Sequence, residues 1–191
     1  MPAGIKYNLT PDAVERELYD QKEGYRLSGG FNLVIANLVA GSVLPPLAPL
    51  AIDFATRKAT PVVNVKAYAN ISAKKLKIEK GSLVKQGMHL GTGAAGATIA
   101  SIDATEADYD ELTLSETIEG VTKGDVLFEA ATVEGTEVKN VANALNFTFC
   151  KVETGATITA LGRAYEIKTD KLYVPVSAKD KASLGARFMF I

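Results

Sequence analysis

Apolar and polar residues alternate along the middle of the chain, which is the pattern of β-strands with one buried face. Segments 75–79 (KLKIE) and 112–115 (LTLS) both alternate in this way. Glycine-containing sequences typical of turns lie at residues 80–82 and 122–125, and a further apolar segment follows at 126–129. Short strands separated by turns roughly every 8–12 residues predict a small β-barrel or β-sandwich.

The first third of the chain combines a helix start with apolar and proline-rich sequence. Thr10-Pro11-Asp12 places a hydroxyl cap before proline and an acid, which predicts a short helix ending at Gly24. Residues 31–40 are apolar, and their pattern does not distinguish a strand from a buried arm. Because proline disfavours helix at its own position and at the one before, we expect residues 44–49 (LPPLAP) to be extended and to cross a surface, the chain's own or a partner's.

The last third is again rich in strand-forming residues. Segments 143–152 and 157–167 carry threonine and β-branched residues, which favour strands. The sequence from Ser177 predicts a short helix that ends at Gly185. The apolar run 188–191 (FMFI) predicts a strand that closes a sheet or docks on a neighbour.

Composition excludes several classes of protein. The chain has 191 residues and a formal net charge of −1, with acidic and basic residues interspersed, so we expect no nucleic-acid partner and no anionic-membrane patch. The most apolar stretch, residues 31–52, is interrupted by prolines and does not predict a membrane span. A single cysteine rules out an internal disulfide, and we expect no signal peptide and folding in a reducing cytoplasm.

Residues 91–96 (GTGAAG) match the glycine pattern of dinucleotide-binding loops, and Asp110 follows at the expected distance. That pattern binds phosphate only when a helix begins directly after it. Here strand-like sequence follows, so we expect a glycine-rich loop between strands.

The remaining candidates for chemistry are isolated. Asp103, Glu106, Asp108 and Asp110 lack the order of a calcium loop and predict an exposed acidic turn. His89 is the sole histidine, and Cys150 lies in apolar sequence typical of a buried residue. We therefore predict no catalytic residue, no metal site and no cofactor.

The proline-rich segment and the C-terminal third together resemble the head-decoration proteins of lambda-like phages. The segments that carry this resemblance are 44–53, 54–58, 144–167, 177–184 and 187–191. The chain is also similar to head-fibre or auxiliary capsid proteins of phages that infect Bacteroides-type bacteria. Those similarities lie in 9–14, 18–22, 29–33 and 185–191.

The resemblance implies a mainly β fold with a β-tulip-like decoration body, a small barrel or sandwich. We expect an N-terminal arm with a short helix at residues 1–43 and a discontinuous body at 44–64 plus 134–191. Residues 65–133 have no counterpart in the lambda-like pattern and are expected to form an inserted small β-barrel domain.

The resemblance further implies a non-enzymatic virion protein on the outer surface of a phage capsid, made in the host cytoplasm. Its expected partners are the major capsid protein, further copies of itself in a homotrimer, and another head-fibre protein, and it would stabilise the capsid or anchor a fibre. In this family the N-terminal arm orders on the capsid. The corresponding capsid-contacting residues are Tyr7, Leu9, Leu18, Tyr19, Tyr25, Phe31, Leu33, Ile35, Leu38, Leu44, Pro45, Pro46 and Leu47.

Two other classes of function remain open from the sequence. One is a small-ligand-binding barrel that uses the glycine loop near His89 and Asp110. The other is a tail or baseplate adhesin whose inserted domain binds host glycan, which exposed aromatic residues on one face would support.

Overall fold

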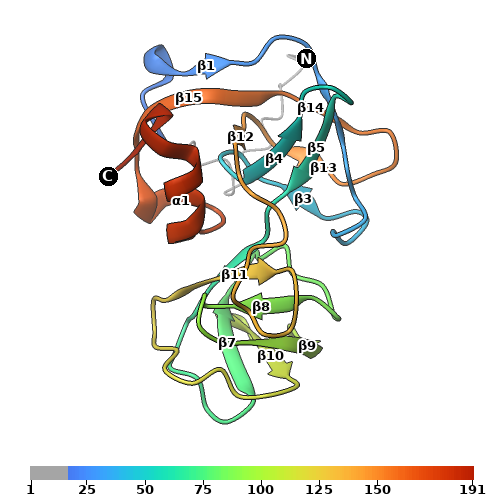
Figure 1. Ribbon diagram of the computed structural model, residues 1–191, viewed down its shortest axis with the longest axis vertical. Coiled ribbons are helices and arrows are strands. Elements are labelled where there is room, and N and C mark those ends of the chain that lie inside the picture. The colour runs from blue at the N-terminus through green and yellow to red at the C-terminus, as the bar shows by residue number, and fades with distance from the viewer. Residues whose placement is uncertain (1–16) are drawn as a thin grey trace, which may run out of the picture.

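The computed structural model describes residues 17–191, whose strands form a large and a small body stacked end to end (Figure 1). The large body holds an eight-stranded sheet ordered β1-β15-β12-β4-β5-β2-β14, with β16 paired to β15, and a separate pair of β3 and β13. Its strands are β1 (Tyr25–Arg26), β2 (Phe31–Leu33), β3 (Val43–Leu44), β4 (Pro49–Asp53), β5 (Lys58–Pro61), β12 (Ala144–Asn146), β13 (Cys150–Lys151), β14 (Thr157–Ile158), β15 (Ala160–Ile167) and β16 (Phe188–Phe190).

The small body is a six-stranded sheet ordered β6-β11-β8-β9-β10-β7, and all its neighbouring strands are antiparallel. Its strands are β6 (Asn64–Lys66), β7 (Lys75–Glu79), β8 (His89–Gly91), β9 (Gly96–Asp103), β10 (Tyr109–Leu114) and β11 (Val126–Ala130). The edge strands approach each other, but an isolated bridge between Ala67 and Ile78 replaces a ladder. The predicted mainly β fold is therefore confirmed and is sandwich-like, and no described sheet closes into a barrel.

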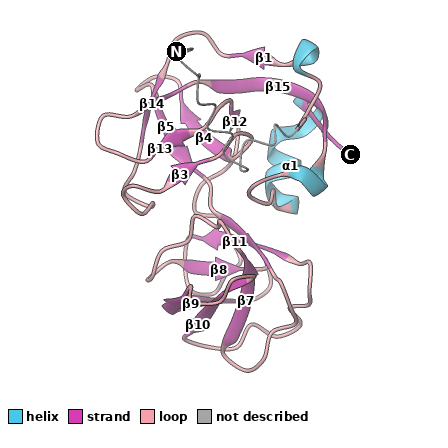
Figure 2. Ribbon diagram, turned by 180° about the vertical axis from the view of Figure 1, so that it is seen from behind, coloured by secondary structure: helices cyan, strands magenta, loops and turns pink. Residues whose placement is uncertain are grey.

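Helical structure is short and lies on the large body (Figure 2). The α-helix α1 (Ala178–Leu184) begins where the sequence predicts, because Ser177 and Asp180 form a reciprocal capping box, and Gly185 caps its end. Three single 3₁₀ turns are also present among the described residues, η1 (Gln21–Glu23), η2 (Thr169–Lys171) and η3 (Gly185–Arg187). The predicted terminal strand is confirmed as β16, which pairs in parallel with β15. None of the helices at residues 17–191 has the length and apolar character needed to cross a membrane.

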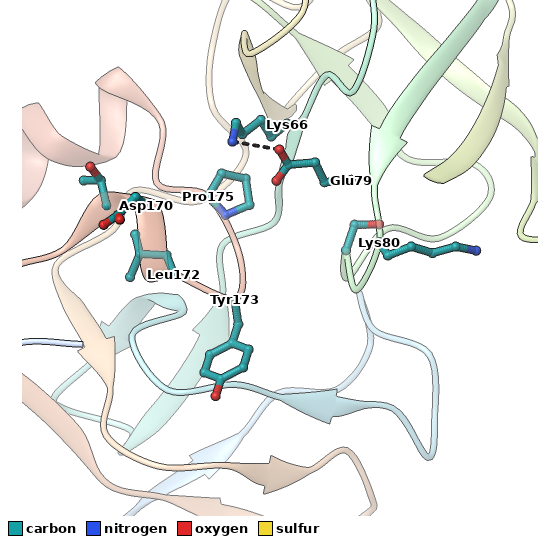
Figure 3. Close-up of a pocket in the computed structure, with 9 residues that line it drawn as sticks. Lys66, Glu79, Lys80, Asp170, Leu172, Tyr173 and Pro175 are labelled. Atoms are coloured by element: carbon teal, nitrogen blue, oxygen red, sulfur yellow. Dashed lines mark ion pairs between the residues drawn. The ribbon is translucent and has the colours of Figure 1, made fainter. Parts of the chain in front are cut away.

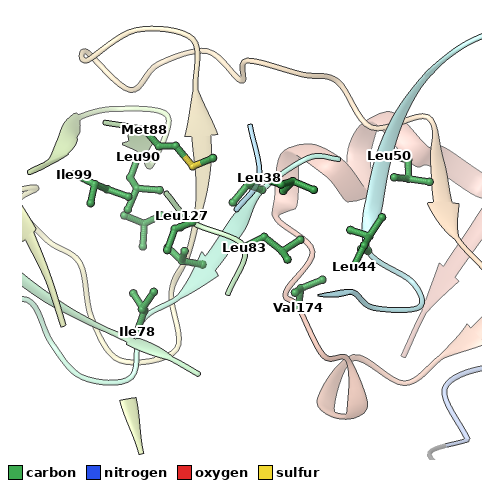
Figure 4. Packing of buried hydrophobic residues seen from close by; sticks show 14 of the residues in the cluster. Leu38, Leu44, Leu50, Ile78, Leu83, Met88, Leu90, Ile99, Leu127 and Val174 are labelled. Atoms are coloured by element: carbon green, nitrogen blue, oxygen red, sulfur yellow. The ribbon is translucent and has the colours of Figure 1, made fainter. Parts of the chain in front are cut away.

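A continuous hydrophobic core joins the two bodies (Figure 4). Leu38, Leu44 and Val174 of the large body belong to the same buried cluster as Leu83 and Leu127 of the small body. A second cluster packs α1 and β16 against the other face of the large sheet, through Leu184 and Phe188. Because one buried apolar cluster contains side chains of both bodies, the small body packs directly against the large one and is not connected to it by a linker alone.

Buried polar side chains fix the two points where the chain passes between the bodies. At the start of β6, the Asn64 amide donates to Asp180 Oδ2 of α1 at 2.7 Å, and both residues are almost fully buried. At the end of β11, buried Glu129 forms an ion pair with Lys139 at 2.7 Å and accepts from the Asn37 amide at 3.4 Å. Both crossings therefore carry directional bonds in addition to apolar packing.

The predicted helix from Thr10 to Gly24 begins outside the described residues, and its described part is not an α-helix. Leu18 and Asp20 instead follow the end of β15: Lys168 N donates to the Leu18 carbonyl at 2.9 Å, and Asp20 N donates to the Tyr165 carbonyl at 3.3 Å. Only the turn η1 is helical, capped by the Asp20 side chain. Pairing with β15 satisfies backbone groups that a continuing helix would have used itself.

The proline-rich segment turns, so the expectation of an extended arm is wrong there. Ala48 N donates to the Pro45 carbonyl at 3.4 Å, and Leu47 has φ 61°, which makes residues 45–48 a tight turn. The Asn146 amide donates to the Pro45 carbonyl at 2.8 Å, and the Asn146 carbonyl accepts from Leu47 N. The turn is held because Leu44 and Leu47 are both fully buried in the large body.

Candidate functional site

A groove runs along the waist between the two bodies (Figure 3). Its floor is the segment 169–175 of the large body, and its opposite wall carries Lys66, Glu79 and Lys80 of the small body. The widest section holds about 440 Å³ and is lined by Val43, Pro45, Phe149, Leu172 and Tyr173 together with polar residues. Three adjoining hollows share Asp170 and Leu172, so they form one continuous groove.

One end of this waist groove is apolar and open to solvent. Phe149 and Val43 are 53% and 50% exposed. Phe149 packs edge-to-face on Tyr173, with ring centroids 5.2 Å apart. Exposed large apolar side chains gathered at a concave place are typical of an interaction surface.

The charges around the waist groove are mostly paired. Lys66 bonds Glu79 at 2.7 Å, drawn in Figure 3, and Lys80 bonds Asp110 at 2.6 Å. Within residues 17–191 the Asp170 carboxylate has no basic partner, although it lines all three sections. The groove thus offers an apolar end and, among the described residues, an exposed carboxylate outside the ion pairs that involve Lys66 and Lys80.

The residues predicted to contact a capsid fall into three groups. Tyr7 and Leu9 lie outside the described residues. Tyr25 on β1 is 55% exposed, and Ile35 and Pro46 are partly buried. The others are buried in the chain's own core; they are Leu18, Tyr19, Phe31, Leu33, Leu38, Leu44, Pro45 and Leu47.

Apart from Pro45, which is among the predicted capsid-contacting residues, sequence reasoning did not single out the residues of the waist groove. Phe149 was expected within a strand-rich segment, and Asp170 and Tyr173 belong to no motif. They meet Val43 and Lys80 only because the two bodies fold against each other. No local pattern signals such a groove, since its walls are distant in sequence.

The glycines of the loop at residues 91–96 allow its backbone to pack closely against the backbone at Gly135. Gly93 N donates to the Gly135 carbonyl at 2.9 Å, and a Cβ on Gly91 or Gly96 would lie 2.4–2.5 Å from Gly135. Strand β9 begins directly at Gly96, so no helix N-terminus faces the loop. The turn at Gly135 occupies the space that a phosphate would need, which removes the basis for a nucleotide site here.

Other candidate residues are engaged in ordinary bonds. His89 Nδ1 lies 2.7 Å from Thr98 Oγ1, and Asp103 accepts from Thr105, which lowers the pKa of that carboxyl. Cys150 is partly buried, and burial raises the pKa of its thiol, which disfavours the nucleophilic thiolate. Among residues 17–191, no group of three or more histidine, cysteine or acidic side chains could hold a metal.

An aromatic pair lies on the small body, where an adhesin would need exposed rings. Tyr68 and Tyr109 stack with centroids 5.4 Å apart. Lys77 Nζ lies 4.4 Å from the Tyr109 ring centroid, and Lys123 Nζ lies 5.7 Å from that of Tyr68. Since each ring already has a ring and an ammonium as neighbours, the pair is better suited to holding segments together than to stacking on a sugar.

The chain was compared with known protein families, curated proteins and solved structures. A family model described as "Head fiber protein" matches residues 3–187. A search of curated proteins found no match, and a search of solved structures found none either. The family match spans both bodies, including the small one that the lambda-like pattern lacks. The chain therefore belongs to the head fibre protein family of phages, and it is a structural phage protein.

Proposed function

We propose that this protein binds the outer surface of a phage capsid as an oligomer, where it stabilises the shell or anchors a head fibre. The family match over residues 3–187 carries this proposal. Its partners would be the major capsid protein, copies of itself in a homotrimer, and another head-fibre protein. Identical sites repeated over a shell give cumulative stabilisation even when each contact is modest. A catalytic role is not part of the proposal.

We further propose that the N-terminal arm makes the first contact, with Tyr7 and Leu9 on it and Tyr25 beside it. The first described residue, Glu17, forms an ion pair with Lys168 at 2.6 Å. Tyr25 lies on β1 at the edge of the large sheet and is exposed. The buried members of the predicted set would act by holding the root of the arm in place. The division into an arm at 1–43, a discontinuous body and an inserted domain at 65–133 is likewise proposed, with β1 and β2 of the arm paired to strands of the body. All six strands of the small body lie within residues 64–130.

Removal of residues 1–16 should abolish binding to capsids stripped of the protein, while the rest stays folded. The cut is placed there because Leu18 and Tyr19 belong to the core, and a longer deletion would unfold the chain. Cosedimentation measures binding, circular dichroism measures folding, and mass photometry of the intact chain should give three times the chain mass. Undiminished occupancy by the shortened chain would refute the role of the arm, and failure of the intact chain to bind capsids would refute the function.

A further inference from the structure

We propose that the waist groove binds an extended segment of the capsid protein that presents an apolar side chain to Phe149 and Val43 and a basic side chain to Asp170. This inference rests on the proposed function, because it names the surface that would complete attachment. Three observations support the inference. They are the apolar end of the groove, the exposed Asp170 carboxylate, and the position of the groove beside Glu17, where the described part of the chain begins.

The shape of the groove suits an extended chain. Three adjoining sections run from Val43 and Phe149 past Asp170 to Thr169 and Lys181. A compact ligand would need one enclosed cavity, whereas the most enclosed section holds only about 60 Å³. An extended peptide places successive side chains in successive hollows along such a path.

The charge pattern selects the chemistry of the segment. Glu79, Lys66 and Lys80 already have partners, whereas the Asp170 carboxylate has no basic partner at residues 17–191. A lysine or arginine on the incoming segment would form an ion pair with this exposed carboxylate. An apolar residue of the segment would at the same time cover the exposed side chains of Phe149 and Val43 and displace water from them.

The location connects the groove to the proposed arm contact. Lys168, which holds Glu17 at the root of the arm, directly precedes Thr169 and Asp170 in the floor of the groove. An arm that reaches a capsid from Glu17 would therefore bring the same side of the molecule toward that capsid. One continuous interface would then include both the arm and the groove.

The test compares two phenylalanines of matched exposure at different places. Phe149→Ser changes the groove at a ring that is 53% exposed, and Phe54→Ser changes the loop after β4 at a ring that is 54% exposed. Asp170→Lys reverses the charge of the exposed carboxylate. Binding of each full-length variant to stripped capsids is measured by cosedimentation over a concentration series. We expect F149S and D170K to weaken binding about tenfold or more, and F54S to leave it within about twofold.

The outcomes separate this inference from the proposed function. If removal of residues 1–16 abolishes binding while F149S and D170K bind like the unaltered chain, the function stands and the groove is not the contact. Equal weakening by F54S and F149S would also overturn the inference, because the effect would then not belong to the groove. Circular dichroism of each variant verifies that it is folded before binding is compared.

Discussion

Replacing Gly96 by alanine is expected to lower the free energy of unfolding by about 3 kcal/mol or more. A Cβ at this position would lie 2.5 Å from Gly135 Cα and 2.6 Å from the Leu90 carbonyl oxygen, and both are backbone atoms. Backbone cannot move aside as the tip of a flexible side chain can, so β8, β9 and the turn at Gly135 would have to separate. Urea unfolding followed by circular dichroism measures the change.

The matched control is Gly30→Ala. Gly30 also lacks a positive φ, but its Cβ would lie 3.8 Å from the nearest heavy atom, the Ile158 carbonyl oxygen. We expect a change within about 0.5 kcal/mol there. Equal losses at Gly96 and Gly30 would show that the close approach of the glycine backbones contributes nothing, and the glycine loop would need another explanation.

Replacing Asp180 by alanine should cost about 3 kcal/mol, because one carboxylate oxygen serves three donors in a buried place. Its Oδ2 accepts from Ser177 N at 3.0 Å, Ser177 Oγ at 2.6 Å and Asn64 Nδ2 at 2.7 Å. Alanine would remove the shared acceptor of these donors at a site that is 1% exposed, although Asn64 Nδ2 would keep its bond to the Pro175 carbonyl. It would also remove half of the capping box of α1.

A double-mutant cycle with Asn64→Ala isolates the bond that crosses between the bodies. We expect a coupling energy of about 1–2 kcal/mol from urea unfolding of the four proteins. The control is Asp125→Ala, since Asp125 Oδ2 accepts from Thr122 N and Thr122 Oγ1 in the same way but is exposed, and should cost under about 1 kcal/mol. Zero coupling would mean that the bond between Asn64 and Asp180 does not contribute to joining the two bodies.

The sequence predicted correctly those elements that are determined by residues adjacent in sequence. Strand β7 has the bounds that the alternation of residues 75–79 gives, and α1 begins after Ser177 and ends at Gly185 because the cap residues are adjacent in sequence. The terminal strand was likewise predicted, although its parallel pairing with β15 was not.

Other elements depend on distant partners, so their sequence is not informative alone. The backbone of residues 18–20 forms hydrogen bonds with residues at the end of β15, and these bonds replace the hydrogen bonds within the segment that the predicted helix would have had. The turn at Leu47 requires a positive φ in a leucine, which is uncommon and is tolerated here because the side chain is buried and Asn146 bonds the turn on both sides. Strand β8 begins at His89, directly after a turn in which Gly87 has φ 87° and Met88 N donates to the Lys85 carbonyl.

The candidate site was the part least accessible to sequence reasoning. The arm was chosen for its apolar residues, but apolarity alone does not separate a contact surface from a core, and most of those side chains are buried. The waist groove was missed because Phe149, Asp170 and Lys80 come from three separate segments. The glycine loop was set aside for the right reason, the strand that follows it, but its partner Gly135 could not be foreseen.

The way in which the small body is mounted has a mechanical consequence. The chain enters through β6 and leaves through β11, and these antiparallel strands lie side by side, with Phe128 opposite Asn64. Both strands are bonded to the large body at the same end, β6 through Asn64 to Asp180 and β11 through Glu129 to Asn37. A drag force that pulls the small body away would therefore stretch two backbones in parallel, and each would carry about half of the tension. Because the two strands are pulled in the same direction, the hydrogen bonds between them are not sheared, and the mount would also resist twisting better than a single connecting strand.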